Sequence, residues 1–451
     1  DLTGMPIANA SMLDEATAAA EAMTLAKRSV KSKSNVFVVA GDAHPQTIEV
    51  IQTRAAPLGI TVKLVRSGDE WQAAIAQDDY FAALNQYPGS SGWLADWQLS
   101  ADLIHSKQAA FILAADLMAL VLLKSPGEMG ADIVVGTTQR FGMPMGAGGP
   151  HAAYLACRDD FKRSMPGRLV GVSVDVHGKP AYRLALQTRE QHIRREKATS
   201  NICTAQVLPA VVASMYAVYH GPEGLKRIAR RVATYTAIFA QGLQTLGFKL
   251  RKETAFDTVW IAIGESSAPL IERARQAGMN LRKACDKSVS ISLDETTTRE
   301  DIQALWQVFA AESATPGQSL PSFDAFEKGV EVARGCLAGK CLVQGLAQLM
   351  VLELTRKQVV EVECPVKVQA QRSLQVEGAG RIIRQQDVLG SDRLYAAAVL
   401  VAAEHVGHRD QHALDQLLHV ALELHALARR QRERDRHAVG DAGDARILPV
   451  D

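Results

Sequence analysis

A glycine-rich stretch, GTTQRFGMPMGAGGPH (residues 136–151), follows the apolar run ADIVV. Its closing glycines, which begin at Gly146, let the backbone make close turns with positive φ angles, so that N–H groups can approach a ligand. Gln139 and Arg140 form a polar pair between the apolar run and these glycines. Glycines alone do not separate a ligand-binding loop from a tight connection, and both interpretations stay open at this point.

A second candidate is the cationic stretch TREQHIRREKATSNICTAQ (residues 188–206). Basic side chains crowd its first half, and hydroxyl and amide side chains follow where the next apolar helix should begin. Free N–H groups and capping side chains at a helix start can bind an anion, and guanidinium groups strengthen such a site. The residues predicted to contact an anion are Arg194, Arg195, Ser200, Asn201 and Thr204. The alternative is a solvated charged loop with ordinary helix capping.

The first expected helix, in ASMLDEATAAAEAM (residues 10–23), opens with Asp14 and Glu15. Carboxylates suit the positive end of a helix dipole, but they would repel a phosphate placed there. We therefore interpret this pair as structural capping.

These stretches need a scaffold, and helices alternate with strands from residue 11 to about 207. The alternation predicts an α/β fold with a mostly parallel sheet covered on both faces. Ligands in such sheets bind at the carboxyl ends of the strands, where the stretch 136–151 would lie. The expected strands are residues 35–42, 61–66, 80–89, 109–116, 131–138 and 152–157.

A different order begins near residue 205 and predicts a smaller α+β domain. Two helices are expected in succession, over residues 205–220 and 224–247, and Thr297 with Glu300 is expected to form a capping box later in this domain. The further expected elements are strands at 248–252, 257–264 and 288–293 and helices at 268–278 and 295–311. We therefore expect a large domain over residues 1–207, the small domain over 208–318 and a tail over 319–451.

The tail is atypical in composition. After Phe326 its only aromatic residue besides histidine is Tyr395. Its clustered histidines lack a recognisable ligand pattern and indicate compositional bias rather than a metal site. Two explanations compete for the tail: a genuine appended segment, or a sequence that has left its coding frame, which the composition favours.

The overall composition bounds the partners. Fifty basic against forty-nine acidic residues leave a net charge of +1, which argues against nucleic acid or an anionic membrane as a partner. The longest apolar run, residues 109–123, is too short to span a bilayer. Six irregularly spaced cysteines predict free thiols and no metal site. No signal-peptide pattern is present, so we expect a cytoplasmic protein.

Several long motifs resemble the P-proteins of the glycine cleavage system, the glycine dehydrogenase (decarboxylating) family. They are residues 1–23, 130–154, 165–173 (MPGRLVGVS), 188–206 and 292–302 (SLDETTTREDI). The resemblance extends from residue 1 to about residue 320. It implies the type I pyridoxal-phosphate-dependent transferase-like fold.

The family's members carry two homologous halves, and the active half has a His-Lys-Thr motif whose lysine stands seven residues before the glycine run. Seven residues before Gly146 here is Gln139, with Phe141 and Pro144 in register with the family's Phe and Pro. Glutamine cannot form an imine. The resemblance therefore implies a non-catalytic N-terminal half or a truncated chain, with no catalytic residue of its own.

The resemblance also implies the activity of the whole enzyme. Glycine is decarboxylated on pyridoxal phosphate, and the remaining aminomethyl group passes to the lipoyl arm of the H-protein. The implied partners are glycine, the H-protein and the catalytic half, in an oligomer. We hypothesise that the five predicted anion-contacting residues face the catalytic half and help to hold its cofactor phosphate.

Two further function classes stay open. One is a self-sufficient pyridoxal-phosphate enzyme, such as an aminotransferase or desulfurase, for which Lys197 is the best candidate lysine. The other is an interaction scaffold with no part in catalysis. A reducible imine on the isolated chain would distinguish the first, and arginine substitutions without effect on turnover would distinguish the second.

Overall fold

The computed structural model describes residues 1–10, 12–66, 68–146, 148–186, 191–198, 202, 206–252, 255–264, 266–311 and 320–327. Its larger sheet contains β1 (Ile7–Ala8), β2 (Val36–Ala40), β3 (Thr61–Val65), β4 (Ala82–Tyr87), β5 (Ala110–Ala115), β6 (Ile133–Thr137) and β7 (Ala153–Cys157). The helices against it are α1 (Glu15–Ser29), α2 (Pro45–Ala55), α3 (Gly68–Gln77), α4 (Gln98–Ser106), α5 (Leu117–Leu120) and α7 (Val207–Thr245). Of the tail expected over 319–451, all but residues 320–327 lie outside the described ranges.

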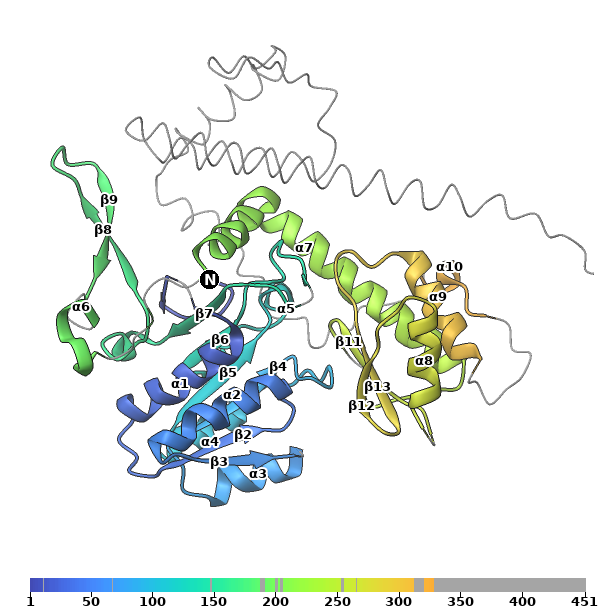
Figure 1. Ribbon diagram of the computed structural model, residues 1–451, viewed down its shortest axis with the longest axis horizontal. Coiled ribbons are helices and arrows are strands. Elements are labelled where there is room, and N and C mark those ends of the chain that lie inside the picture. The colour runs from blue at the N-terminus through green and yellow to red at the C-terminus, as the bar shows by residue number, and fades with distance from the viewer. Residues whose placement is uncertain are drawn as a thin grey trace, which may run out of the picture. The chain divides into compact units, whose positions relative to one another are not determined.

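The larger sheet has the order β1-β7-β6-β5-β4-β2-β3 (Figure 1). Strands β2 to β6 pair in parallel, whereas β7 is antiparallel to both β6 and β1. The α/β class and the six strands expected from the sequence are confirmed. The short strand β1 had no signal in the sequence because it spans two residues.

Both faces of this sheet are covered by helices. Alternate residues of a strand point to opposite faces, so Phe37 packs with α1 and α2, while Val38 packs with α3, α4, α5 and α7. All six residues of β4 and of β5 are buried. Double coverage explains the continuous apolar run of β5, whereas β4 also contains the buried polar residues Asn85 and Gln86.

The smaller sheet is antiparallel and has the order β10-β11-β13-β12. Its strands are β10 (Lys249–Leu250), β11 (Thr258–Ala262), β12 (Arg282–Cys285) and β13 (Ser288–Ser292), and the helices α8 (Ala268–Gln276), α9 (Arg299–Ala310) and α10 (Phe323–Glu327) follow in this part of the chain. Strand β12 was not predicted because its residues are mostly polar and exposed. The expected α+β character is confirmed, while the exact domain boundaries stay a prediction.

One local prediction in this part needs correction, and another is confirmed. The capping box of α9 is formed by Thr298 and Asp301, one residue beyond the predicted pair Thr297 and Glu300. Thr297 instead hydrogen-bonds Asp294 in the preceding turn. The two successive helices expected over 205–220 and 224–247 are confirmed, because the range labelled α7 consists of two helices that meet at a kink, where Gly221 has a non-helical φ of 60° before Pro222.

A two-stranded hairpin, β8 (Leu169–Val174) and β9 (Pro180–Ala185), stands apart from both sheets (Figure 1). It was not predicted, although MPGRLVGVS had been noted as a motif. The short helices η2 (Asp159–Phe161), α6 (Gln191–Arg194) and η4 (Arg195–Lys197) flank it, and η1 (Ala56–Leu58) follows α2. None of the helices in the described ranges has the length and apolar character needed to cross a membrane.

Candidate functional site

Three segments bring a buried ion-pair cluster together at the carboxyl end of the larger sheet. Asp116 follows β5, Arg140 lies in the turn after β6, and Asp257 directly precedes β11. Arg140 Nη1 lies 2.5 Å from Asp257 Oδ2 and 3.4 Å from Asp116 Oδ2. We call these three residues the Arg140 cluster. It links the end of the larger sheet to the start of a strand in the smaller one.

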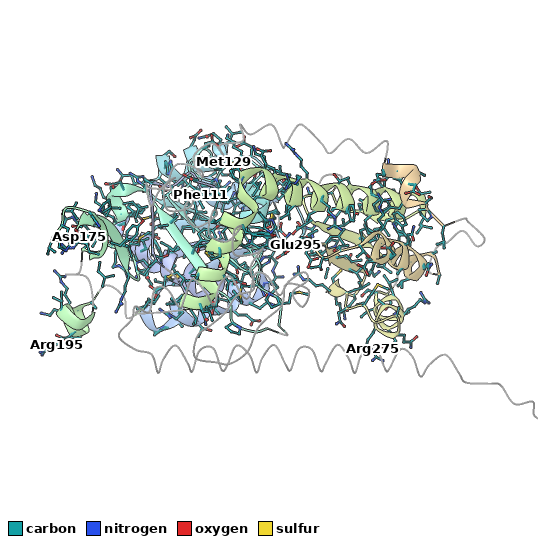
Figure 2. The ribbon with its side chains drawn as sticks, turned by 90° about the horizontal axis from the view of Figure 1, so that it is seen from above. Phe111, Met129, Asp175, Arg195, Arg275 and Glu295 are labelled. Carbon is teal, nitrogen blue, oxygen red and sulfur yellow. The ribbon has the colours of Figure 1, made fainter. Side chains whose placement is uncertain are left out.

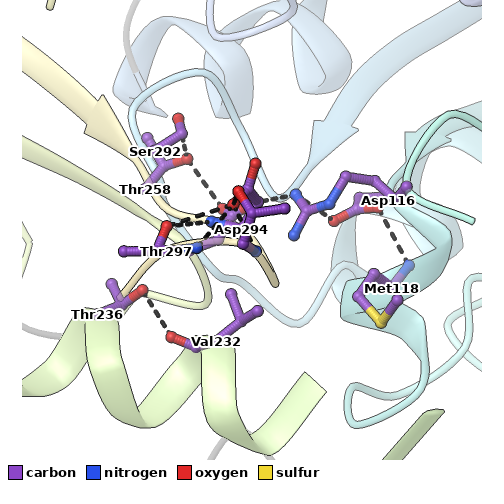
Figure 3. Close-up of polar contacts among 11 residues, drawn as sticks. Asp116, Met118, Val232, Thr236, Thr258, Ser292, Asp294 and Thr297 are labelled. Atoms are coloured by element: carbon purple, nitrogen blue, oxygen red, sulfur yellow. Dashed lines mark hydrogen bonds and ion pairs between the residues drawn. The ribbon is translucent and has the colours of Figure 1, made fainter. Parts of the chain in front are cut away.

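Local hydrogen bonds hold both carboxylates of the cluster in place (Figure 3). Asp116 caps α5 by accepting a hydrogen bond from the Met118 N–H at 3.1 Å. The Thr258 hydroxyl donates to Asp257 Oδ1 at 2.9 Å and also lies 2.8 Å from the Ser292 hydroxyl. The two carboxylates are therefore positioned by their own elements before they meet Arg140.

Burial makes the charges of this cluster interdependent. The side chains of Arg140, Asp116 and Asp257 are 21%, 17% and 10% exposed. Burial alone would lower the pKa of Arg140, but the two carboxylates outweigh it and raise that pKa, so the guanidinium stays charged. Burial raises the pKa of Asp116, against the opposing effect of Arg140. One guanidinium thus compensates two carboxylates in a place with little water.

The cluster does not fit a cofactor bound through a lysine. The only side-chain nitrogen of Gln139 is an amide, which donates to Pro144 O at 3.2 Å. The carboxylate at the end of β5 is already paired with Arg140. At the start of α1, Asp14 accepts from Thr17 N at 2.7 Å, and Glu15 Oε2 lies 2.7 Å from the imidazole of His151. Such a helix start favours no phosphate, and the bond from Thr17 confirms Asp14 as the capping residue of α1.

Aromatic rings pack tightly around the turn that carries Arg140. The Tyr154 hydroxyl donates to Ala115 O at 2.8 Å, and a Cβ on Gly136 would lie 2.2 Å from that carbonyl oxygen and 2.9 Å from the Tyr154 ring. Phe141 stacks on Tyr216 of α7 with ring centroids 5.7 Å apart. Close packing on both sides therefore fixes the turn, and it leaves Arg140 few alternative conformations.

The residues predicted to contact an anion are only partly described. Ser200, Asn201 and Thr204 lie outside the described residues, whereas Arg194 and Arg195 are exposed. Figure 2 shows Arg195 at the periphery of the molecule. The two arginines stand at the junction of α6 and η4.

The segment that follows these arginines lies against the outer side of α1 and α2. Glu196, Ala198 and Ile202 line a cavity of about 660 Å³ together with Lys27, Arg28 and Arg54. Lys27 and Arg28 belong to the last turn of α1. These three described residues of the segment therefore lie near the opposite end of α1 from Asp14 and Glu15.

Neither Asp116 nor Asp257 was singled out from the sequence. Asp116 interrupts the apolar run of residues 109–123, and it follows a buried strand at the end where ligands bind in α/β sheets. That position was the available signal. Asp257 precedes a strand of the other sheet and is 117 residues from Arg140 in the sequence, so no local pattern pointed to it. Among the described residues, no group of three or more histidine, cysteine or carboxylate side chains could hold a metal ion.

A second charged cluster surrounds Asp132 at the opposite end of the larger sheet. Asp132 accepts hydrogen bonds from His105 Nε2 at 2.8 Å, Arg158 Nη1 at 2.7 Å and Phe111 N at 2.8 Å. Burial alone would raise the pKa of Asp132, but these bonds outweigh it and lower that pKa. The bond to Asp132 raises the pKa of His105, against burial and the charge of Arg158, with support from Asp102. His105 sits in the last turn of α4, where a positive charge suits the helix dipole.

The replacement His105→Gln is expected to remove a pH dependence of stability. The pKa of His105 is raised above its ordinary value of 6.5 in the folded chain. The contribution of His105 to the free energy of unfolding is therefore complete below pH 6.5 and is lost as pH rises through the folded pKa. Because the imidazole is 38% exposed, the contribution should stay below about 1 kcal/mol. Urea unfolding from about pH 6 to about pH 8.5 measures it. His177→Gln, at an exposed hairpin turn, is the control, and an unchanged pH slope in the His105 variant would contradict the assignment.

The fold and the site together define the class of protein. The structure is similar to a solved crystal structure of glycine decarboxylase (P-protein) of the glycine cleavage system in inhibitor-bound form, with a TM-score of 0.63, 32% sequence identity, and coverage of 69% of this chain and 72% of that one. The chain has the type I pyridoxal-phosphate-dependent transferase-like fold expected from the resemblance.

The family follows from the sequence comparisons. The family model for the glycine cleavage system P-protein matches residues 1–309. The chain is 65% identical over 330 residues to a glycine dehydrogenase (decarboxylating) of Variovorax paradoxus and 56% identical over 331 residues to one of Cupriavidus metallidurans. The chain belongs to the glycine cleavage system P-protein family. Each match covers 73% of this chain but only 34% and 33% of the relatives, so the chain spans about a third of their length.

Proposed function

We propose that this chain is the non-catalytic N-terminal half of a glycine decarboxylase and that it acts by supporting a lysine-bearing catalytic half. The observation that carries the proposal is the Arg140 cluster. At the end of the sheet where such an enzyme would bind its cofactor, Arg140 is paired with Asp116 and Asp257, and Gln139 takes the place that the family gives to lysine.

The proposed reaction belongs to the assembled enzyme. Pyridoxal phosphate is held by the catalytic half, glycine is decarboxylated there, and the aminomethyl group passes to the lipoyl group of the H-protein. The family membership of residues 1–309 supports this reaction. We place the assembly in the cytoplasm as an oligomer, in accord with the net charge of +1 and with cysteines that form no disulfide among the described residues.

The first test is an absorption spectrum of the purified chain with pyridoxal phosphate, before and after borohydride, with peptide mapping of any label. We expect no labelled lysine on the isolated chain. Glycine decarboxylation should appear only when the lysine-bearing half is added. A stoichiometric label on Lys197, which lies exposed in η4, would instead make this chain an enzyme by itself.

The proposed anion contacts have a separate test. We propose that Arg194, Arg195, Ser200, Asn201 and Thr204 turn toward the cofactor phosphate of the catalytic half. Arg195→Ala should then weaken the affinity of the assembled enzyme for pyridoxal phosphate as well as its turnover. Arg275→Ala, at an arginine of α8 whose side chain is 68% exposed, is the matched control. Unchanged cofactor affinity and turnover in the Arg195 variant would remove this role.

A further inference from the structure

Exposed apolar side chains are concentrated in one part of the chain. The described residues include sixteen exposed large hydrophobic side chains, and twelve of them lie between Met145 and Tyr219. Exposed hydrophobic residues scattered singly are normal, whereas a concentration of them marks a binding surface. This part contains the glycine-rich turn, the hairpin and the first half of α7, all of which follow β6 in the sequence.

The hairpin presents one apolar face. Directly opposed residues share a face, and the register pairs Val170 with Leu184, Val172 with Tyr182 and Val174 with Pro180. The side chains of the β8 valines on this face are 54%, 57% and 67% exposed, and Tyr182 is 59% exposed. The other face carries smaller or polar residues, among them Ser173. The face of these six opposed residues is hereafter the hairpin face.

A free hairpin of this kind is physically costly. At its base, Leu169 is buried in the core of the large sheet, but the rest of β8 and β9 pairs with no third strand in the described ranges. An isolated two-stranded hairpin is marginally stable in water, and an apolar face on it adds an aggregation hazard. Figure 2 shows Asp175, at the hairpin turn, well away from the middle of the molecule. The hairpin therefore reaches outward as an arm.

The first half of α7 carries a strip of exposed apolar side chains in addition to the hairpin face. The exposed fractions are 50%, 72% and 47% for Val207, Leu208 and Val211. About three helical turns beyond Val207, they are 54% and 67% for Val218 and Tyr219. The spacings of four and eleven residues place Val207, Val211 and Val218 on one side of the helix. The same half of α7 carries Tyr216, which packs on the turn beside Arg140. Tyr216 is nine residues from Val207, so it faces the opposite side of the helix, and the strip is left uncovered by that contact.

We propose that the hairpin face is a docking surface for the lysine-bearing catalytic half, an inference that rests on the function proposed above. The occupant follows from chain length. The matched relatives are about three times as long as the matched part of this chain. In those relatives, the rest of the protein, about two thirds of its length, is covalently joined to the part that corresponds to this chain. Contact with that rest buries the apolar arm and the strip of α7, and it brings the second half over the carboxyl end of the sheet.

The test measures the dissociation constant between the full chain and the separately produced catalytic half. Val172→Lys places a charge at the centre of the hairpin face and should raise the dissociation constant at least about 100-fold, as burial of an unpaired charge at an interface centre does. Leu99→Lys, at a side chain that is 82% exposed on α4, should change it less than about twofold. Ser173→Lys tests the opposite face of the same strand. The unfolding midpoints of the free variants should match the parent, because all three side chains lie outside the core.

The outcomes separate this inference from the proposed function. An unchanged dissociation constant for Val172→Lys, with glycine decarboxylation retained by the mixture, would overturn the docking surface and leave the proposed function intact. A mixture of unmodified chains that neither associates nor decarboxylates glycine would overturn the proposed function itself. Loss of self-association in Val172→Lys, with binding to the catalytic half unchanged, would assign the face to a second copy of this chain and overturn the inference.

Discussion

Replacing Arg140 by alanine is expected to lower the free energy of unfolding by about 3–5 kcal/mol, because it leaves two buried carboxylates without a counter-charge. Arg140 is the cation paired with both Asp116 and Asp257, and these side chains are at most 21% exposed. Urea unfolding followed by circular dichroism measures the loss. Arg275→Ala is the matched control, because Arg275 forms an ion pair with Glu272 in which the side chains are 68% and 50% exposed, and such pairs contribute about 0–1 kcal/mol.

The loss in the free energy of unfolding caused by Arg140→Ala should also depend on pH. Without the guanidinium, burial holds the pKa of the Asp116 carboxyl group above its unfolded value. The neutral form of Asp116 then stabilises the folded chain at low pH, and that stability is lost as pH rises through the folded pKa. The variant should therefore differ more from the parent at about pH 8 than at about pH 5. Adding Asp116→Asn and Asp257→Asn should recover part of the loss, and a triple variant no more stable than Arg140→Ala would argue against unpaired charge as the cause.

The sequence predicted the larger sheet well because its strands carry an unambiguous signal. Strands such as β5 are buried on both faces, and double burial favours an apolar residue at nearly every position. The hairpin lacked that signal because β8 alternates valine with glycine and serine, and β9 includes proline and arginine. Its pairing depends on the partner strand and, in our proposal, on a partner chain. Neither can be recognised in a short window of sequence.

The candidate site could be predicted only in part, because its residues come from segments that are far apart in the sequence. The glycine-rich stretch identified the correct end of the sheet, and comparison with the family motif directed attention to Gln139. The role of its neighbour Arg140 could not be seen, because its partners come from a different strand end and from the other sheet. Charge pairing across 117 residues is decided by how the two sheets meet, which no local pattern encodes. The capping box of α9 was displaced by one residue because three consecutive threonines, Thr296–Thr298, offer nearly equivalent capping side chains.

The contact between the two sheets beside Arg140 also makes Gly92 intolerant of a side chain. Gly92 has a φ of 78°, and a Cβ there would lie 1.9 Å from the carbonyl oxygen of Thr258, the first residue of β11. Neither backbone can yield easily, since Gly92 N–H donates to Gly89 O at 2.8 Å and Thr258 adjoins Asp257 of the Arg140 cluster. Gly92→Ala therefore combines a strained φ with a forced separation of the sheets, and we expect a loss of about 2–5 kcal/mol.

The glycine at position 59 provides the control for that prediction. Gly59 has a nearly identical φ of 65°, but no atom lies within 4 Å of the position of its Cβ. Gly59→Ala therefore carries only the conformational cost of about 1–2 kcal/mol. The difference between the two variants in urea unfolding isolates the steric contact with Thr258. Since that contact lies one residue from Asp257, Gly92→Ala and Arg140→Ala should also be non-additive when combined. Equal losses at positions 59 and 92 would show that the loop after β4 does not press against β11, and that the Arg140 cluster joins the two sheets without its help.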